Sequence, residues 1–218
     1  ADSFTIMRHD KTPTYNFACA VDDMLNDISI VIRGKDHLNS TFRQEHIRAS
    51  LKYDKNIEYA HLPKILNSDA PSVKSLLEEG FLPEAISNYL ISTGSKPPKE
   101  IFTTSEAIEW FNLEDISKSS TQFNIETLKH INSEHLKMLD TKELSRYVGF
   151  ADEEIGHLTR VYLEEVSTTK ELRSKIKAIF ETKQIPEEYM KQSVLITKAI
   201  KSAPYFDAYT DFKNYLIK

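Results

Sequence analysis

Two hydrophobic periods alternate along the first part of the chain. Apolar residues recur at helical spacing in "PTYNFACAVDDML", which starts at Pro13, and they predict a helix. The β-branched run "DISIVIRG" predicts a buried strand that ends at Gly34. Alternating residues in "SFTIMR" predict an earlier strand, and "IEYAHLPKIL" predicts a later one.

A capping box predicts a helix between the last two strands. In Thr41-Phe42-Arg43-Gln44 a hydroxyl is followed three residues later by a glutamine, so a helix is predicted to begin there and to run to about Tyr53. Strand, helix and strand in succession form part of a parallel sheet, but a doubly wound domain needs more strands than these. Either the fold is small or the sheet has lost its other half.

From about Pro71 onward the pattern is helical almost throughout. Gly80 closes one predicted helix, and Pro83 stands at the first position of the next. Two further capping boxes, Thr103 to Glu106 and Thr168 to Glu171, predict helix starts. The stretch "SKSSTQ" predicts a loop. The remaining helices are predicted near 105–112, 124–132, 141–148, 152–165, 169–182, 187–202 and 208–217.

The composition is that of an ordinary globular protein of one or two domains, with 218 residues, 40% hydrophobic and 28% charged. Cys19 is the only cysteine and the seven histidines form no HExxH pattern, so we expect neither an internal disulfide nor a bound metal. No apolar run is long enough to span a bilayer, and the first residues lack the pattern of a signal peptide. We therefore expect no membrane partner and a cytoplasmic location.

The charge is unevenly distributed. The net charge of −5 argues against a wholly basic nucleic-acid binder. Residues 166–201, however, contain eight Lys or Arg against four Asp or Glu. Such a segment is either an ordinary solvated helical surface or a face that binds the phosphate backbone.

Arg33 is the strongest candidate for a binding residue on physical grounds. It lies at the carboxyl end of a predicted parallel strand, where ligands bind in open sheets. A guanidinium there could hold a carboxylate by two parallel hydrogen bonds, and Asp36 and His37 follow closely enough to reach the same ligand. Tyr15 and Cys19 are one helical turn apart, so Tyr15 could cap a small pocket. The alternative is an arginine that is solvated or paired locally.

Several longer segments occur in an order typical of one enzyme family. The segments "TPTYNF", "VDD", "VIRGKDHLNSTFRQ" and "AHLPKILN" resemble the second half of the catalytic domain of the glutamyl-tRNA synthetases, the bacterial class I enzymes. The resemblance continues through "LLEEGFLPEAISNYL" and "EIFTTSEAIEWFNLEDISKSSTQFNIETLKHIN", and it weakens after about Lys137.

The resemblance implies a fold and a domain plan. It implies an α/β region with a partial Rossmann-type parallel sheet, followed by a mainly α-helical stem-contact and helical-bundle region. Residues 1–62 would be the second half of the catalytic domain, residues 63–135 the stem-contact region, and residues 136–218 part of the helical anticodon-binding region.

The resemblance also implies an activity, which is the ATP-dependent attachment of L-glutamate to tRNA. ATP with Mg would be the co-substrate, tRNA and L-glutamate the partners, and the enzyme a monomer. Tyr15 and Arg33 match positions that line the glutamate pocket, where the arginine would bind the side-chain carboxylate. Asp36 and His37 match positions near the amino acid and ATP. Lys35 and Phe42 depart from the family pattern.

Two catalytic signatures of that family are absent from the chain, so its catalytic residues are unknown. One is the HIGH-type sequence, whose histidines help to stabilise the transferring phosphate. The other is the lysine-rich KMSKS-type loop, of which about eight residues are missing at Asp69-Ala70. We expect an incomplete part of the enzyme, inactive alone, whether these segments are missing only from this sequence, were removed, or were lost in a natural derivative.

Three alternatives stay open. The chain could be a non-catalytic helical tRNA-binding module derived from a synthetase. It could be a truncated paralogue that attaches glutamate to a modified tRNA base, although the long helical part counts against that. The glutamine tRNA could also be served, because the anticodon contacts lie mostly beyond this chain.

Overall fold

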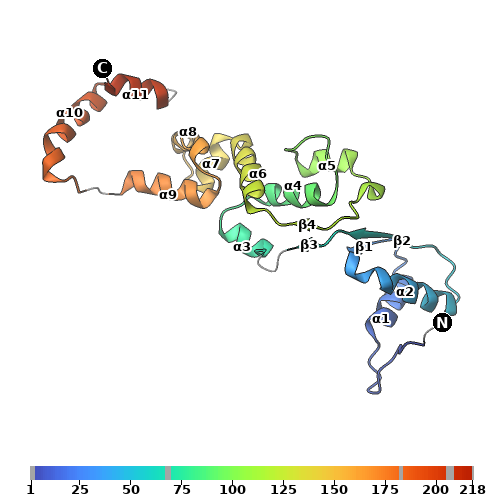
Figure 1. The fold of residues 1–218 in the computed structure, drawn as a ribbon. Helices are drawn as coiled ribbons and strands as arrows, with labels where there is room; N and C mark the ends of the chain where they lie inside the picture. Colours follow the sequence, from blue (N-terminus) through green and yellow to red (C-terminus); the bar gives the residue numbers. More distant parts are fainter. Residues whose placement is uncertain (1–2, 67–69, 182–183, 205–208, 218) are drawn as a thin grey trace. The chain divides into compact units, whose positions relative to one another are not determined.

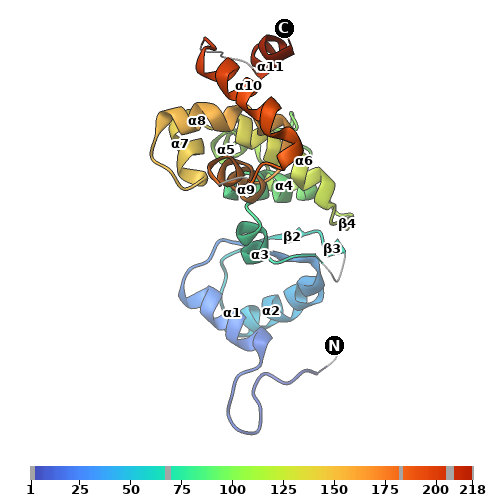
Figure 2. The same cartoon turned by 90° about the vertical axis from the view of Figure 1, so that its left-hand side faces the viewer.

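The computed structural model describes residues 3–66, 70–181, 184–204 and 209–217. The chain divides into two compact units, which are described separately. Unit 1 comprises residues 1–70 and 87–125, and unit 2 comprises residues 71–86 and 126–218. Figures 1 and 2 show the elements from two directions.

The described elements have the following bounds. The strands are β1 (Ile30–Gly34), β2 (Glu58–Leu62), β3 (Ile65–Leu66) and β4 (Thr121–Gln122). The first α-helices are α1 (Tyr15–Leu25), α2 (Leu38–Ser50), α3 (Val73–Glu78), α4 (Pro83–Gly94), α5 (Thr104–Trp110) and α6 (Ile125–Met138). The later ones are α7 (Thr141–Tyr147), α8 (Glu153–Arg160), α9 (Thr169–Phe180), α10 (Met190–Lys201) and α11 (Tyr209–Ile217). Short 3-10 helices cover Lys35–His37, Leu113–Asp115, Leu163–Glu165 and Glu187–Tyr189.

β1 and β2 form a parallel pair whose register places Arg33 beside His61. Paired residues of adjacent strands point to the same face of a sheet, so these two side chains share a face. Figure 1 shows α1 and α2 on one side of the pair. The register therefore fixes which strand residues can meet the helices.

Both predicted strands of this pair are confirmed, but the expectation that the first is buried was wrong. Ile30 and Ile32 are 45% and 51% exposed, whereas Val31 between them is half-buried. Alternate residues of a strand point to opposite faces. The face that carries Ile30 and Ile32 is largely open to solvent, and the other meets the helices.

The predicted strand at "SFTIMR" does not form. Met7 and Pro13 make only an isolated antiparallel bridge, and Lys11 between them has a φ of 67°. The hydroxyl of Thr14 donates to the carbonyl oxygens of Thr5 at 3.0 Å and Ile6 at 3.2 Å. The carbonyls of this segment are thus bound by the start of α1 instead of a neighbouring strand.

The helix start predicted at Thr41 was also wrong. α2 begins at Leu38, directly after the 3-10 turn, and it ends at Ser50. Thr41 and Gln44 lie inside the helix, where their side-chain oxygens accept hydrogen bonds from Arg33. Arg33, which only the tertiary structure brings near, thus replaces the backbone N–H groups that would be the partners of these side chains in a capping box.

The segment "IEYAHLPKIL" splits into two strands. Pro63 has no backbone N–H for a ladder, and it lies between β2 and β3. β3 pairs in parallel with β4, with Ile65 opposite Thr121. β4 lies in "SKSSTQ", so the loop predicted there was wrong for its last two residues.

In the later part of unit 1, a buried amide holds one loop in place. The side-chain oxygen of Asn88 accepts a hydrogen bond from the Phe102 N–H, and its amide donates to the Glu100 carbonyl, both at 3.0 Å. The buried ring of Phe102 packs edge-on against Trp110, with centroids 5.2 Å apart. The capping box from Thr103 to Glu106 is confirmed at the start of α5.

Unit 2 depends on a second buried amide. The side-chain oxygen of Asn132, on α6, accepts from the Leu82 N–H at 2.7 Å, and its amide donates to the Ser167 carbonyl at 2.5 Å. Gly80, with a φ of 88°, has its carbonyl bound by the Thr169 N–H at 2.9 Å. A Cβ on Gly80 would lie 2.5 Å from the Lys170 backbone nitrogen, so glycine is required.

The predicted helices of unit 2 are confirmed, with changed ends. α6 continues to Met138, beyond the predicted end at 132, and α8 stops at Arg160 instead of 165. The capping box from Thr168 to Glu171 is confirmed, and a further one from Asp140 to Glu143 was missed. The missed box begins with Asp, whereas the pattern sought begins with a hydroxyl.

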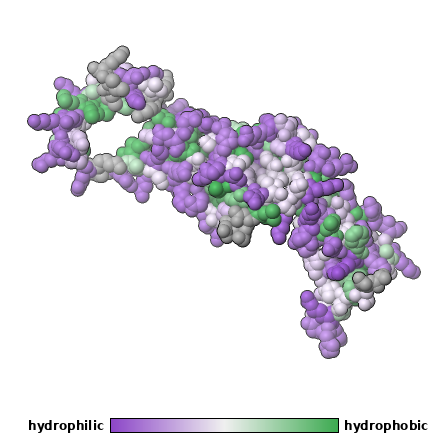
Figure 3. All heavy atoms as spheres, viewed as in Figure 1, coloured by the Kyte–Doolittle hydropathy of each residue, from purple (hydrophilic) through white to green (hydrophobic). Residues whose placement is uncertain are grey.

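α10 carries apolar side chains that the described structure leaves exposed. Val194 and Leu195 are 67% and 68% exposed, and no described residue of this helix is buried. Figure 3 shows hydrophobic atoms at the surface of this part of the chain. Packing against the other described residues therefore contributes little to the stability of α10.

Replacing Asn132 with Leu should destabilise unit 2. The change places an apolar side chain of similar size in a fully buried position, and it leaves the Leu82 N–H without its acceptor. We expect the free energy of unfolding to fall by about 2 kcal/mol or more, measured by urea unfolding with circular dichroism. The control is Ser133→Ala, which removes only a 3.4 Å hydrogen bond to Val166. Equal costs for the two variants would contradict this account.

The stability of unit 2 should fall in mild acid because of His135. Burial lowers the pKa of His135, although Glu84 partly opposes the shift. An unfolded histidine titrates near about 6.5, so below that pH the unfolded state binds more protons than the folded state. The contribution is present above about pH 6.5 and is lost as the pH falls toward the lower folded-state pKa.

His135→Gln should flatten this dependence. We expect the melting temperature of the variant to fall less than that of the wild type between about pH 7.5 and about pH 5.5. His61, whose pKa is also lowered, is present in both proteins and cancels in the comparison. Parallel curves for the two proteins would show that His135 does not titrate with folding.

Candidate functional site

The guanidinium of Arg33 is bound by three neutral side chains. Nη2 donates to Thr41 Oγ1 at 2.7 Å and Nη1 donates to Gln44 Oε1 at 2.8 Å. Nε lies 3.4 Å from His61 Nε2, which must be unprotonated to accept. We call Thr41, Gln44 and His61 the neutral acceptors of Arg33. These bonds fix the orientation of the guanidinium and leave its charge unneutralised.

Local structure explains how these residues meet. The parallel register sets His61 beside Arg33 on β1. Thr41 and Gln44 are three residues apart on α2, so they lie on the same face of the helix. The amide of the fully buried Gln44 also donates to Asn16 Oδ1 of α1 at 3.3 Å. The arrangement thus ties β1, β2, α1 and α2 together.

A second arginine lies beside the first. The guanidinium carbons of Arg33 and Arg48 lie 4.9 Å and 5.7 Å from the ring centroid of Tyr59. Arg48 is 4% exposed, and its Nη2 donates to the Tyr59 hydroxyl at 2.8 Å. Its Nη1 has no hydrogen-bond partner among the described residues. Two positive charges therefore share one aromatic ring.

Asp23 is the acidic group whose charge acts on both arginines. Burial raises the pKa of Asp23, while the charges of Arg48 and Arg33 lower it. Among the described residues, neither arginine forms an ion pair with a carboxylate within 4.0 Å. With two guanidiniums and no ion-paired carboxylate among the described residues, the cluster is electrostatically suited to an anion.

Tyr15 and His37 lie near the same guanidinium. Their rings are tilted, with centroids 5.3 Å apart. Burial raises the pKa of Tyr15 most, the Cys19 side chain raises it further, and interaction with the Arg33 guanidinium lowers it. The predicted residues Tyr15, Arg33 and His37 are therefore brought together by the structure.

Asp36 stands at the margin of this group. Its carboxylate lies 3.7 Å from His37 Nε2, and its side chain is 71% exposed. Its Oδ1 is also 2.5 Å from the point that a Cβ on Gly34 would occupy, so a larger residue at position 34 would make this exposed side chain move. Asp36 thus faces solvent beside His37 and makes no described contact with Arg33.

His61 is kept neutral by its surroundings. Burial lowers its pKa most, followed by the charges of Arg33 and His37. The neutral form is the one that can accept from Arg33 Nε, so electrostatics and hydrogen bonding agree. Sequence analysis missed this residue because only the pairing of β1 and β2 brings it to Arg33.

Thr41, Gln44, Arg48 and Tyr59 were also missed as site residues. The spacing of Thr41 and Gln44 is visible in the sequence, but there it indicates a helix cap and not a binding site. A buried arginine at position 48 could have been suspected from the helical period, because Ile47 and Arg48 follow Gln44 at the spacing of one buried face.

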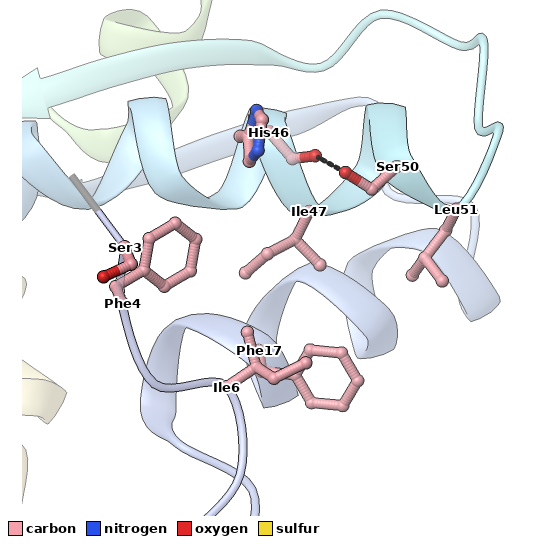
Figure 4. A pocket seen from close by; sticks show the side chains of 8 residues that line it. All are labelled: Ser3, Phe4, Ile6, Phe17, His46, Ile47, Ser50 and Leu51. Carbon is pink, nitrogen blue, oxygen red and sulfur yellow. Dashed lines mark hydrogen bonds between the residues drawn. The ribbon is translucent and has the colours of Figure 1, made fainter. Parts of the chain in front are cut away.

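Two of the cavities lined by described residues lie in unit 1. An apolar one of about 400 Å³ is lined by Phe4, Ile6, Phe17, Ile47 and Leu51 together with Ser3, His46 and Ser50. Figure 4 shows these side chains between the N-terminal segment, α1 and α2. It shares no lining residue with the Arg33 cluster, and an apolar lining does not recognise a carboxylate.

The other cavity, of about 560 Å³, adjoins the cluster through His61 and Tyr59. Lys35 and Lys118 line it, and Lys35 Nζ donates to the Lys118 carbonyl at 2.8 Å. Glu58 also lines it, so its charges are mixed.

No group of three or more His, Cys, Asp or Glu side chains among the described residues is placed to hold a metal ion. No helix in the described part of the chain is both long and apolar enough to cross a bilayer.

Comparison with known sequences gives matches over the whole chain. Residues 1–130 match the family described as "tRNA synthetases class I (E and Q), catalytic domain". The chain is 64% identical to "Glutamate--tRNA ligase 2" of Sulfurimonas denitrificans, over 100% of the chain and 52% of that protein. It is 51% identical to "Glutamate--tRNA ligase 1" of Nitratiruptor sp., with the same coverage. The chain thus spans about half the length of the curated relatives that it matches.

The first of these alignments runs over 226 positions, eight more than the 218 residues of the chain. At least eight positions of the relative therefore have no counterpart here.

Solved structures share the fold. A glutamate tRNA ligase from Elizabethkingia meningosepticum, in complex with its amino acid, superimposes with a TM-score of 0.72 at 24% identity, over 91% of this chain and 49% of that one. A glutamate-tRNA synthetase from Elizabethkingia anophelis gives 0.71, over 94% and 50%. The predicted fold class, a partial Rossmann-type α/β region followed by a mainly helical region, is confirmed.

Proposed function

The chain belongs to the class I tRNA synthetases for glutamate and glutamine, and from this premise we propose that it is part of an enzyme that attaches L-glutamate to tRNA with ATP. Arg33 carries the proposal. Its guanidinium is held in one orientation by neutral partners, so its charge is available to a ligand. The glutamate side chain presents the planar carboxylate that a guanidinium binds bidentately.

The charge of the site favours glutamate over glutamine. A glutamine side chain is neutral and would not offset the positive charge of Arg33 and Arg48. An unpaired charge in a partly buried site is costly, so a carboxylate ligand gains more than an amide. The names of the two relatives above, both glutamate–tRNA ligases, agree with this preference.

The other predicted residues take supporting roles in this proposal. Tyr15 closes the glutamate pocket beside Arg33; burial raises its pKa, and interaction with that guanidinium opposes the rise. Asp36 and His37 lie where the amino acid and ATP approach each other. ATP enters as a co-substrate and brings Mg²⁺ bound to its phosphates. We further propose a monomer that acts in the cytoplasm.

The domain plan belongs to the same proposal. Residues 1–62 form the second half of the catalytic domain, residues 63–135 the stem-contact region, and residues 136–218 part of the anticodon-binding region. The KMSKS-type loop is absent at Asp69-Ala70, of which Asp69 lies outside the described residues. The eight unmatched positions of the alignment support this, although they do not say where the gap lies.

A non-catalytic tRNA-binding module is the second candidate. The excess of basic residues in 166–201 favours it, since such a face binds phosphates without chemistry. The two candidates differ in one respect that can be measured: a module binds tRNA in a salt-dependent way but needs no glutamate pocket.

The 218 residues by themselves should not support ATP–pyrophosphate exchange with glutamate, assayed with tRNA present. They contain neither the HIGH-type nor the KMSKS-type sequence that would stabilise charge on the phosphates. We expect activity to be lower by several powers of ten than that of the complete ligase. Each power of ten corresponds to about 1.4 kcal/mol of activation free energy. Exchange by a fragment of verified mass at a comparable rate would contradict this prediction.

Arg33→Lys and Arg33→Ala in the complete ligase should each impair the use of glutamate. Lysine keeps the charge but loses the planar fork, and alanine loses both. Removing one partner of a buried charge pair costs on the order of 2–5 kcal/mol, so kcat/KM for glutamate should fall roughly thirtyfold to several-thousandfold.

The KM for ATP should change little, because the loss is confined to the amino-acid pocket. Tyr15→Phe should cost about 1 kcal/mol, the value of one neutral hydrogen bond. Steady-state kinetics for both substrates, with folding checked by circular dichroism, provides the test. If Arg33→Ala left kcat and KM for glutamate within about twofold, Arg33 would be only a locally paired residue.

A further inference from the structure

The partners of Arg33 differ from those usual for a partly buried arginine. Such a residue is commonly balanced by a carboxylate, but here all three acceptors are neutral. Gln44 is fully buried, so water does not share its bond to Nη1. The described structure places no carboxylate within ion-pair distance of Arg33.

We propose that Thr41, Gln44 and His61 are positioning residues that fix the Arg33 guanidinium without neutralising it, and that Gln44 thereby sets the preference for a carboxylate over an amide ligand. The proposal rests on the proposed function, since it assigns these residues to the glutamate pocket. It goes beyond that function in assigning specificity to a residue whose side chain, within the described structure, hydrogen-bonds to Arg33 and Asn16.

The hydrogen-bond inventory agrees with this role. An arginine has five N–H groups in a fixed plane. The neutral acceptors bind one N–H each, on Nε, Nη1 and Nη2. These three bonds leave one N–H on each terminal nitrogen, the two that a bidentate carboxylate binds, and the Tyr15 hydroxyl interacts with the same guanidinium. The Tyr59 ring, 4.9 Å from the guanidinium carbon, restricts rotation of the plane further.

The nature of the acceptor at position 44 decides the charge of the site. A glutamate there would have the shape of Gln44, and its carboxylate would pair with Nη1 at the same distance. The charge of Arg33 would then be satisfied internally, and a ligand carboxylate would meet a like charge. A neutral amide acceptor avoids both effects and still orients the guanidinium of Arg33.

Gln44→Glu in the complete ligase is therefore the decisive variant. With tRNA present, we expect the KM for glutamate in ATP–pyrophosphate exchange to rise at least about thirtyfold, with kcat and the KM for ATP within about twofold. The ratio of kcat/KM for glutamate to that for glutamine should fall, because the amide loses less than the carboxylate. A purely structural defect would lower kcat and leave that ratio unchanged.

Two controls separate charge from general damage. Gln122→Glu makes the same chemical change at an exposed position on β4, and it should leave all these constants within about twofold. Thr41→Val removes the acceptor of Nη2 while keeping the side-chain shape, and it should raise the KM for glutamate about tenfold. Thr41→Ser keeps the hydroxyl and should restore the wild-type value.

The outcomes distinguish this proposal from the function on which it rests. If Arg33→Ala impairs glutamate use but Gln44→Glu does not change the glutamate KM, the positioning proposal is wrong and the pocket assignment stands. If neither variant changes it, the pocket assignment itself fails. Should Gln44→Glu not fold, the Thr41 pair decides: equal KM values for Thr41→Val and Thr41→Ser would overturn the proposal.

Discussion

The hydrogen bonding of one guanidinium constrains the whole N-terminal part of unit 1. An arginine that points from a strand toward packed helices must find partners for its N–H groups there, because unpaired buried donors are costly. Arg33 finds them on α2 and β2. This explains why α2 buries Gln44 and Arg48 beside Ile47 on the face that meets the sheet. The face is polar because its partner is charged.

The same constraint gives the site its chemical character. Arg33 and Arg48 share the Tyr59 ring, and Asp23 is the acid whose charge acts on both. Hydrogen bonds from neutral acceptors satisfy the geometry of a guanidinium without cancelling its charge. A site built in this way keeps its positive potential until an anion arrives, whereas an internal ion pair would compete with the ligand.

Unit 2 is held together by a different principle. Its core is apolar, and a few buried polar groups fix how segments meet. Asn132 binds two backbone groups from segments far apart in sequence, and Gly80 lets the chain approach the start of α9. Each contact involves backbone atoms, so it depends on shape more than on charge. α10, in contrast, exposes apolar residues along much of its length.

The sequence by itself determined most of the helices and the family. Helices with side-chain caps, such as α5 and α9, were predicted because Thr103 and Thr168 each satisfy a backbone N–H only three residues away. Arg33 and Tyr15 were predicted as site residues because their place in ordered motifs resembles that of a known family. Those signals need no knowledge of the fold.

Only the tertiary structure decided which long-range partners prevail. Thr41 and Gln44 have the spacing of a capping box. A charged guanidinium is a stronger hydrogen-bond partner than a backbone group, so both side chains bind Arg33 of β1 instead. His61 joined the site through strand register, and "SFTIMR" formed no strand because Thr14 bound its carbonyls. A donor or acceptor can bind either a neighbour in the sequence or a residue far away in it. Local patterns carry no information about which of these hydrogen bonds forms.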